Sequence, residues 1–423
     1  MRLLFLFLVF FAPLIADDDI VVPLATQSRL VPLKYSFTAT NAFDKSFVES
    51  LQKVLKFDLN NNGLTQISSQ ESCPYAAQFY ISDGKLFVRA LDHKKKLKTT
   101  IGGLPLTGEL NKDRRQAHKL NDAICKILFD EEGIATCRFL YTVKNKVGIK
   151  PVAEVFEADY DGANPVQVTH EDTLCVTPAY VPPKKGYAPD SFLYVSYRNG
   201  QPKIYIASLK NGEGEKLLSL RGNQFMPVVS HLCDHVAFIC DIAGNADLFV
   251  QPFDASGQAL GKPRQIFTAI RGTQASPSFS PNGKKVAFVS NKDGAPRVYQ
   301  MDIPASDADV KDVKPKLVSK HNKESTSPCW SPDGSKIAFS SMTAGTRQIW
   351  IYDCETQEEF QLTTGPGHKE NPAWAPNSFH LMYNSANNEK AEIFLTHIYQ
   401  GDGVKITNGP GEKRFASWQP IVK

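Results

Sequence analysis

A short motif recurs six times in about the last two thirds of the chain, and this repeat constrains the fold more than any other feature. Five copies begin with proline and the sixth with alanine, and an aromatic or apolar residue follows two positions later. The starts lie 49, 50, 51, 44 and 44 residues apart. A period of this length is typical of β-propeller blades, each a small sheet of four strands. The copies begin at Pro178, Pro227, Pro277, Pro328, Pro372 and Ala416.

Signals for three further strands follow each of the first five copies. In the unit that begins at Pro328, a turn at residues 332–335 precedes an apolar run at 337–339. A second turn at 344–345 then precedes another apolar run at 349–352. A fourth strand completes each unit. Apolar runs separated by tight turns of this kind predict short antiparallel strands, four to a blade.

The two ends of the repeat region together predict one more blade. Residues 138–142, 155–159 and 166–169 look like strands two, three and four without a strand one. Residues 416–420 look like a strand one with nothing after it. Pairing these segments closes a ring and removes the exposed sheet edges that an open array would leave. We therefore predict a mainly β fold, a six-bladed β-propeller over residues 137–423 closed by pairing of the C-terminal strand with the first blade.

The segment before the propeller has a different pattern. Residues 46–57 carry apolar side chains at helical spacing, and so do residues 112–129. Residues 78–82 and 85–91 alternate around an Asp-Gly turn, which is a hairpin signal. We therefore predict a small α/β domain over residues 41–136.

The N-terminus predicts export. A basic start is followed by an apolar run at residues 3–15, the small residue Ala16 and three aspartates at 17–19. This is the pattern of a secretory signal peptide over residues 1–16. A helix of 13 residues would cover only about 20 Å of a hydrocarbon layer about 30 Å thick, so a membrane anchor is disfavoured. We expect a periplasmic protein whose mature chain starts with an arm and lead-in at residues 17–40.

Eight cysteines are spread over the whole chain, and none has Cys-x-x-Cys spacing. An exported chain could pair them, yet several fall where a strand needs a small apolar residue. The sequence leaves their disulfide state open. The formal net charge of +4 is too small and too dispersed to predict nucleic-acid binding.

The chain resembles a known family. The fullest repeat reads Trp330, Ser331, Pro332, Asp333 and Gly334. Together with the exported arm, the α/β domain and the six blades, it resembles the TolB family of the Tol-Pal system over nearly the whole chain. The resemblance implies a monomeric protein without enzymatic activity or cofactor. It also implies a role in outer-membrane integrity and cell division.

The resemblance further implies two protein partners. In the family the propeller binds the peptidoglycan-associated lipoprotein Pal, and the N-terminal arm binds the inner-membrane protein TolA. Here the arm residues are Ile20, Val21 and Val22, behind a more acidic lead than the family has. A short apolar segment beside acidic residues suits binding by strand addition or folding on contact.

The predicted lipoprotein site lies on one rim of the propeller. The connections from strand four to the next strand one, and from strand two to strand three, meet at the same end of the channel. Polar residues stand just before five of the six motif copies, so they would gather around one opening. The predicted contact residues are Asn223, Gln224, Thr273, Gln274, Lys323, Glu324, Lys369, Glu370, Lys413 and Arg414.

Two other functions compete with this interpretation. A peptidase of the propeller-plus-hydrolase kind needs a G-x-S-x-G nucleophile elbow, and none occurs in the sequence. A propeller that binds a carbohydrate or other small ligand in its channel is the alternative, although no cluster of carboxylates recurs at the rim to support it.

Three motifs that suggest metal or nucleic-acid binding are set aside. His231 and His235 have helical spacing, but the repeat places them in a turn between strands. Residues 58–63 imitate the start of a calcium loop, yet Ser69 stands where a glutamate is needed. The basic run at 93–98 is not interleaved with aromatic residues. We expect no metal site, no nucleic-acid partner and no direct membrane insertion.

Overall fold

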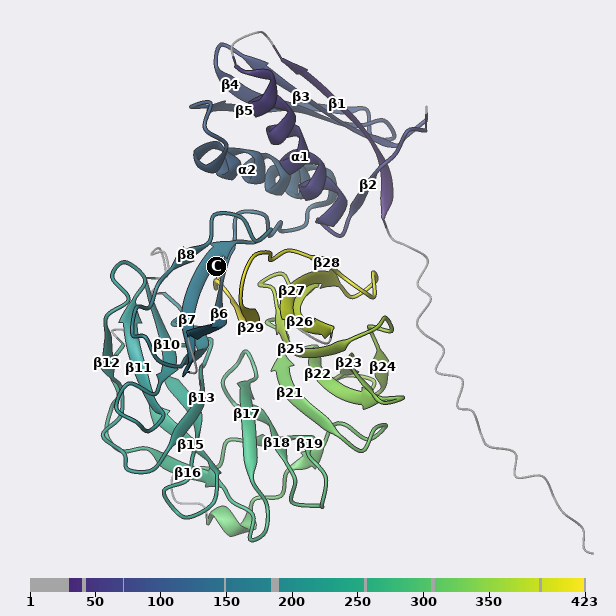
Figure 1. The fold of residues 1–423 in the computed structure, drawn as a ribbon. Helices are drawn as coiled ribbons and strands as arrows, with labels where there is room; N and C mark the ends of the chain where they lie inside the picture. Colours follow the sequence, from purple (N-terminus) through teal and green to yellow (C-terminus); the bar gives the residue numbers. More distant parts are fainter. Residues whose placement is uncertain are drawn as a thin grey trace, which may run out of the picture.

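The computed structural model describes residues 30–39, 43–70, 72–147, 150–183, 190–254, 257–305, 309–387 and 390–421. These form a small α/β domain and a six-bladed propeller (Figure 1). The mainly β fold class is confirmed. The signal peptide and the arm residues Ile20, Val21 and Val22 lie outside the described residues. Among the described helices, none is both long and apolar enough to cross a membrane.

The α/β domain packs two helices, α1 (Lys45–Asn61) and α2 (Leu110–Phe129), against a five-stranded sheet of order β2-β1-β3-β4-β5. One expected boundary is wrong. Residues 31–39, which the sequence analysis assigns to the arm and lead-in, form strand β1 near the middle of this sheet, so the domain begins earlier than residue 41. The strands are β1 (Val31–Ala39), β2 (Thr65–Ile67), β3 (Tyr75–Ser82), β4 (Lys85–Asp92) and β5 (Leu97–Pro105).

Helix α1 ends at Asn61, and the polar residues that follow it terminate the helix. Its apolar stripe, which includes Leu51 and Leu55, is buried against the sheet. After the helix, the side-chain oxygen of Asn62 accepts hydrogen bonds from the backbone N–H groups of Leu64 and Thr65, both at 2.9 Å. Gly63 then takes a left-handed backbone with φ of +73°. The calcium-like segment is therefore a helix terminus.

The propeller consists of six four-stranded antiparallel sheets, which we number as blades 1 to 6. A 3₁₀ turn, η1 (Val310–Asp312), lies in blade 3. Blade 1 holds β9 (Cys175–Tyr180), β10 (Ser191–Ser196), β11 (Lys203–Ser208) and β12 (Gly214–Lys216). Blade 2 holds β13 (Gln224–Val229), β14 (His235–Cys240), β15 (Asp247–Pro252) and β16 (Arg264–Phe267). Blade 3 holds β17 (Gln274–Phe279), β18 (Lys285–Ser290), β19 (Arg297–Asp302) and β20 (Lys316–Leu317).

The last three blades include the one built from both ends of the repeat region. Blade 4 holds β21 (Ser325–Trp330), β22 (Lys336–Thr343), β23 (Thr346–Asp353) and β24 (Glu359–Gln361). Blade 5 holds β25 (His368–Trp374), β26 (His380–Asn387), β27 (Lys390–His397) and β28 (Val404–Lys405). Blade 6 holds β29 (Glu412–Trp418), β6 (Arg138–Val147), β7 (Lys150–Asp159) and β8 (Val166–Gln167).

Blade 6 confirms the predicted closure. Strand β29 pairs antiparallel with β6, with Trp418 opposite Phe139 and Glu412 opposite Lys144. The buried indole of Trp418 also donates from Nε1 to the backbone oxygen of Ala373 in blade 5, at 3.1 Å. The C-terminal strand is thus bonded both to the start of the propeller and to the blade before it.

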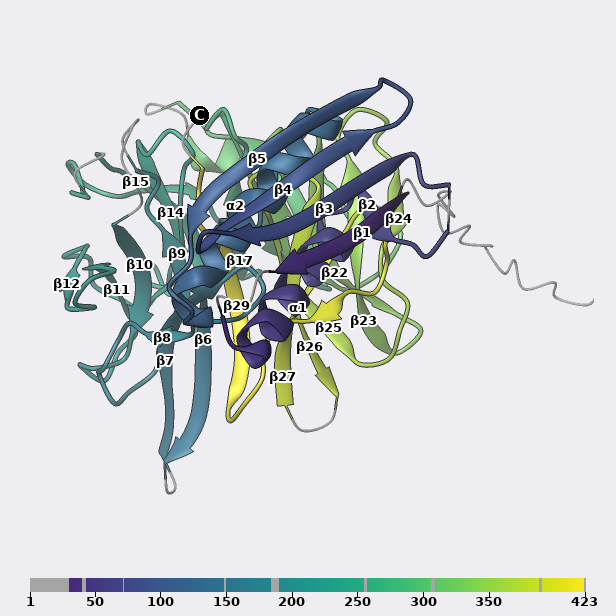
Figure 2. The ribbon, with the colours of Figure 1, turned by 90° about the horizontal axis from the view of Figure 1, so that it is seen from above.

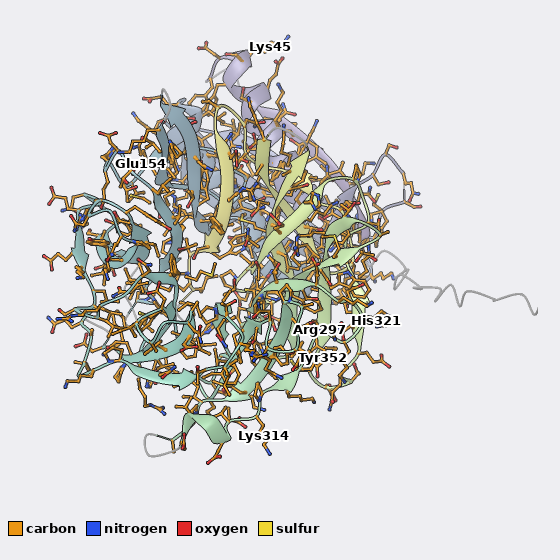
Figure 3. The ribbon with its side chains drawn as sticks, turned by 60° about the horizontal axis from the view of Figure 1, so that its bottom comes forward. Lys45, Glu154, Arg297, Lys314, His321 and Tyr352 are labelled. Atoms are coloured by element: carbon orange, nitrogen blue, oxygen red, sulfur yellow. The ribbon has the colours of Figure 1, made fainter. Side chains whose placement is uncertain are left out.

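Apolar side chains fill the spaces between blades, and they make neighbouring blades depend on each other. Trp330, Phe339 and Trp350 of blade 4 form one buried cluster with Ala287 and Val298 of blade 3. Figure 3 shows how densely side chains occupy the ring, with Lys314 at its border and Lys45 of the α/β domain at the opposite end of the view. A single blade would leave such faces in water, which is why the ring is needed for stability.

The cysteines serve as small core residues. The structure leaves Cys73, Cys125, Cys137, Cys175 and Cys240 free and buried. Burial raises the pKa of Cys137 to about 12, and nearby Asp122 adds to this effect. The thiol of Cys137 is therefore an inert packing group at neutral pH.

The α/β domain sits on one rim of the propeller (Figure 2). Its contacts are with connections from strand one to two and from strand three to four, and we call this end the domain rim. Arg114 of α2 pairs with Asp161 in the turn between β7 and β8, at 2.6 Å. The backbone oxygen of Asn61 lies 3.1 Å from Nε2 of His380 at the start of β26. The predicted contact residues belong to the opposite end, which we call the docking rim.

We expect Trp418→Ala to destabilise the protein by about 3–5 kcal/mol, because it leaves a cavity in the closing strand and removes the bond to Ala373. Urea unfolding followed by far-UV circular dichroism measures this. The matched control is Ile421→Ala, whose side chain is 48% exposed and should change stability by less than about 0.5 kcal/mol. Equal effects of the two changes would contradict a stabilising role for the closing strand.

Candidate protein-docking rim

The ten predicted contact residues divide into two groups in the structure. Six lie at least partly in solvent: Asn223, Thr273, Lys323, Glu324, Glu370 and Arg414. The other four side chains, Gln224, Gln274, Lys369 and Lys413, are buried. A partner would therefore meet the first group directly, while the second group lies beneath the surface.

Two of the buried residues are glutamines that begin strand one of their blades. The side-chain oxygen of Gln224 accepts from the N–H of Ile204 at 3.1 Å, and its nitrogen donates to the oxygen of Leu220 at 2.9 Å. Gln224 thereby joins blade 2 to blade 1. Gln274 has the equivalent place in blade 3, but its side-chain amide makes no hydrogen bond among the described residues.

The other two buried residues are lysines that hold rim loops. Lys369 donates from Nζ to the oxygen of Gly365 at 2.5 Å. Lys413 donates to the oxygen of Gly409 at 2.6 Å and lies 3.1 Å from a carboxylate oxygen of Glu392. Burial lowers the pKa of Lys369 below its ordinary value. Both lysines therefore act within the propeller, where their ammonium groups satisfy carbonyls at the ends of loops.

Side chains from neighbouring turns fix the exposed loops of the docking rim. The carboxylate of Asp241, in the turn between β14 and β15, accepts from the backbone and side-chain nitrogens of Asn223, both at 2.7 Å. In the next blade Asn291 accepts from the N–H of Thr273, also at 2.7 Å. A rim held in this way loses little conformational freedom when a partner binds.

One half of the docking rim carries a continuous line of alternating charges, the charged arc. It crosses blades 4, 5 and 6, and successive members lie 3.5, 3.5, 3.1 and 3.4 Å apart. All five side chains remain partly exposed, so each pair alone stabilises the fold little. Their value lies in a fixed charge pattern that can orient a charged partner. In order, the members are Glu324, Arg347, Glu370, Arg414 and Glu412.

The other half of the rim carries exposed apolar side chains, which we call the apolar corner. Ile270, in the connection from blade 2 to blade 3, is 96% exposed. Ile242, in the turn between β14 and β15, is 42% exposed. Neither isoleucine is among the ten contact residues predicted from the sequence, because that prediction rests on polar residues. The sequence signal for this corner is an isoleucine two residues before a glycine, which occurs at Ile242 and at Ile270.

The channel inside the ring encloses about 340 Å³, lined mainly by proline, aromatic and small polar residues. None of its described lining residues is charged at neutral pH. Strand one of every blade has a bulge here, with a non-glycine residue in the left-handed region at φ between 48° and 59°. These six positions face one cavity, and bulges and strained backbone positions are frequent at functional sites. They are Thr177, Met226, Ser276, Ser327, Asn371 and Phe415.

The metal motif set aside from the sequence has no helix to support it. His235 is the first residue of β14, and His231 lies in the preceding turn. A different group brings donor atoms within 4.8 Å of one another: Asp58, His118 and Asp161, at the domain rim. There the carboxylates already bind Arg114 and Tyr160, so this group forms an ionic contact between the domains rather than an open metal site.

Comparisons with known proteins identify relatives over most of the chain. A family model described as the TolB beta propeller domain matches residues 126–422. Protein TolB homolog of Protochlamydia amoebophila (strain UWE25) is 46% identical over 86% of this chain and 83% of that protein. Protein TolB homolog of Chlamydia pneumoniae is 35% identical over 85% of this chain and 83% of that protein. The crystal structure of TolB from Acinetobacter baumannii matches at 20% identity with a TM-score of 0.74, covering 93% of this chain and 97% of that one.

We expect Asp241→Ala to loosen the loop at Asn223, because two hydrogen bonds to a carboxylate are lost. The cost should be about 1–3 kcal/mol, with faster hydrogen exchange at the amide of Asn223. Urea unfolding and exchange mass spectrometry test this. The control is Asp302→Ala, because that carboxylate is 81% exposed and lies 3.8 Å from Lys285. Unchanged exchange at Asn223 would contradict the pinning of this loop.

Proposed function

The chain belongs to the TolB family, and from that premise we propose that it is a periplasmic adaptor of the Tol-Pal system without catalytic activity. It would bind a Pal-like outer-membrane lipoprotein at the docking rim and a TolA-like inner-membrane protein through its arm. By joining the two membranes it would support outer-membrane integrity and cell division. The signal-peptide pattern of residues 1–16 supports the periplasmic location.

One observation supports binding of the lipoprotein at the docking rim: this rim combines exposed isoleucines with the charged arc, on loops that are held by hydrogen bonds. A fully exposed apolar side chain costs free energy in water and gains it when a partner covers the side chain. The charged arc would then select the partner and set its orientation. The α/β domain occupies the domain rim, so it leaves this surface accessible. A partner here would bury on the order of 1,200–2,000 Å².

The arm site rests on sequence and on connectivity. Ile20, Val21 and Val22 precede β1 by fewer than 12 residues, so the arm leads directly into the sheet of the α/β domain. A partner held by the arm would therefore act on this domain first. The lipoprotein would act on the propeller, from the other rim.

Small-ligand binding in the channel is the alternative function. The cavity is large enough for a small molecule. Its described lining offers no charged group, and its polar atoms are few. An uncharged ligand would be the kind that this lining accommodates, and no further contact favours it over the adaptor function.

We expect Ile270→Ser to weaken lipoprotein binding by about tenfold or more, because it removes an apolar contact without disturbing the fold. Calorimetric titration of residues 17–423 with the soluble domain of the same organism's Pal measures this. The matched control is Leu232→Ser, an exposed leucine in a turn of the domain rim, which should bind as the parent does. Binding lost in the control alone would place the partner on the domain rim. No binding by the parent protein would contradict the adaptor function.

Removal of residues 17–29 should abolish binding of a TolA-like domain and leave lipoprotein affinity within about twofold, provided that the two sites are separate surfaces. The deletion ends before β1, so the α/β domain should remain folded. Circular dichroism checks the fold, and titration with each partner measures binding. Unchanged TolA-like binding would show that the arm is not its site.

A further inference from the structure

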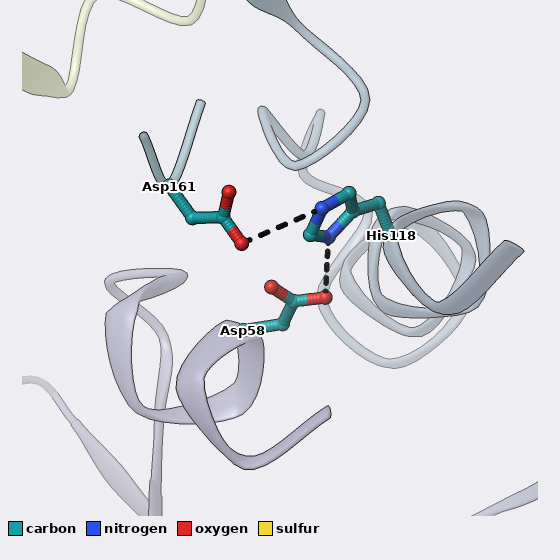
Figure 4. Close-up of side chains that lie close together, drawn as sticks. All are labelled: Asp58, His118 and Asp161. Carbon is teal, nitrogen blue, oxygen red and sulfur yellow. Dashed lines mark hydrogen bonds and ion pairs between the residues drawn. The ribbon is translucent and has the colours of Figure 1, made fainter. Parts of the chain in front are cut away.

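A buried histidine lies between the two domains. His118 of α2 is 2% exposed, and its Nδ1 lies 2.9 Å from a carboxylate oxygen of Asp58 on α1 (Figure 4). On the other side of the imidazole, Nε2 of His118 lies 3.6 Å from a carboxylate oxygen of Asp161, which belongs to the propeller. The imidazole therefore stands between one carboxylate of its own domain and one of the neighbouring domain.

Other groups around the histidine define its electrostatic environment. Arg114, one turn earlier on α2, donates to Asp161 at 2.6 and 2.9 Å. From the propeller, the hydroxyl of Tyr160 donates to Asp58 at 2.6 Å, and its ring meets the imidazole edge to face. The carboxylate of Asp122, one turn further along α2, accepts hydrogen bonds from Ala135 and Thr136.

Formal charge favours a proton on His118. Two carboxylates and one guanidinium leave this buried group with a net charge of −1, and an imidazolium brings it to zero. An uncompensated charge in the interior is expensive, whereas a balanced and hydrogen-bonded set is tolerated. The carboxylates of Asp58 and Asp161, the guanidinium of Arg114 and the imidazolium would then form a neutral cluster. We call the contact of Asp58, His118 and Asp161 within this cluster the joint.

Hydrogen bonding leads to the same protonation state. Among the described residues Nε2 of His118 has no hydrogen-bond partner. In a neutral ring that donates from Nδ1 to Asp58, Nε2 is an acceptor whose lone pair faces the oxygen of Asp161. In the imidazolium it is an N–H that faces the same oxygen and attracts it. Protonation thus changes a repulsive contact between the domains into an attractive one.

The shift in the pKa of His118 agrees with this geometry. Burial alone lowers the pKa of His118, but the charge and hydrogen bond of Asp58, and then the charge of Asp161, raise it above the ordinary value despite Arg114. A histidine whose folded-state pKa is raised stabilises the fold fully below about pH 6.5, its unfolded value. That stabilisation is lost as the pH rises through the folded-state pKa.

We propose that protonated His118 locks the α/β domain onto the propeller by bridging Asp58 and Asp161, and that loss of the proton loosens this joint. The joint is independent of any partner, so it does not rest on the proposed adaptor function. His380, whose Nε2 lies 3.1 Å from the oxygen of Asn61 across the same boundary, behaves oppositely. Burial lowers its pKa to about 3, so it is neutral throughout the range in which His118 titrates.

The test is a nuclear magnetic resonance titration of residues 17–423 with labelled histidine, from pH 5 to 9. We expect the His118 resonance to titrate above pH 6.5 in the parent protein and to shift downward in Asp161→Asn. Hydrogen exchange of residues 159–165 should be about tenfold less protected at pH 8.5 than at pH 6, after correction for the intrinsic rate. In Asp161→Asn this difference should shrink.

The controls separate this joint from general effects of pH. His170→Gln changes an exposed histidine of the propeller and should keep both the titration and the exchange difference. The titration of the parent protein tests the proposal even if Asp161→Asn does not fold. A His118 that titrates at or below pH 6.5, or exchange that is independent of pH, would overturn the proposal. A titration that moves when a chelator is added would also overturn it, because a metal ion rather than a proton would then fill the gap.

Discussion

Closure of the ring by β29 and β6 is the constraint on which the rest of the structure depends. Each blade buries its faces against its neighbours, so a gap at any position would expose two apolar faces at once. Blade 6 prevents this by joining segments about 270 residues apart in sequence, with Trp418 opposite Phe139. Folding of the propeller therefore requires both ends of the repeat region. The loop-closure entropy of this one blade is offset by the burial of apolar faces in all six.

Closure also determines where the two domains meet. Asp161 and Tyr160, which contact the α/β domain, lie in the turn that follows β7 in the closing blade. His380, the other contact described above, lies in blade 5, which Trp418 bonds directly. The α/β domain is thus seated on the two blades that complete the ring. Separation of β29 would weaken the ring and the domain contact together.

The sequence predicted the blades well because a propeller repeats its local signals. Turns such as Asp333-Gly334 and apolar runs recur with one period, and the closing blade follows from counting strands. The burial of Gln224 and Lys369 could not be read in this way. Their polarity indicates a surface, whereas the loop carbonyls that bind them are brought close only by the fold. The cluster around His118 was missed for the same reason, since Asp161 comes from the other domain.

The two rims of the propeller differ in how firmly their surfaces are held. On the docking rim, short turns held by Asp241 and Asn291 present Ile270 and the charged arc on a rigid ring, so a partner there meets a preformed surface. On the domain rim, the attachment combines the packing of Phe57 against Tyr160 with buried polar groups, and the strength of the polar part depends on the protonation state of His118. The contacts described above join the α/β domain to blades 5 and 6, so the free energy of binding at the docking rim would reach this domain through these blades. Any coupling between the two ends would therefore involve the contacts at this boundary, among them the joint of Asp58, His118 and Asp161 and the contact of His380 with Asn61, and it must be equal in both directions.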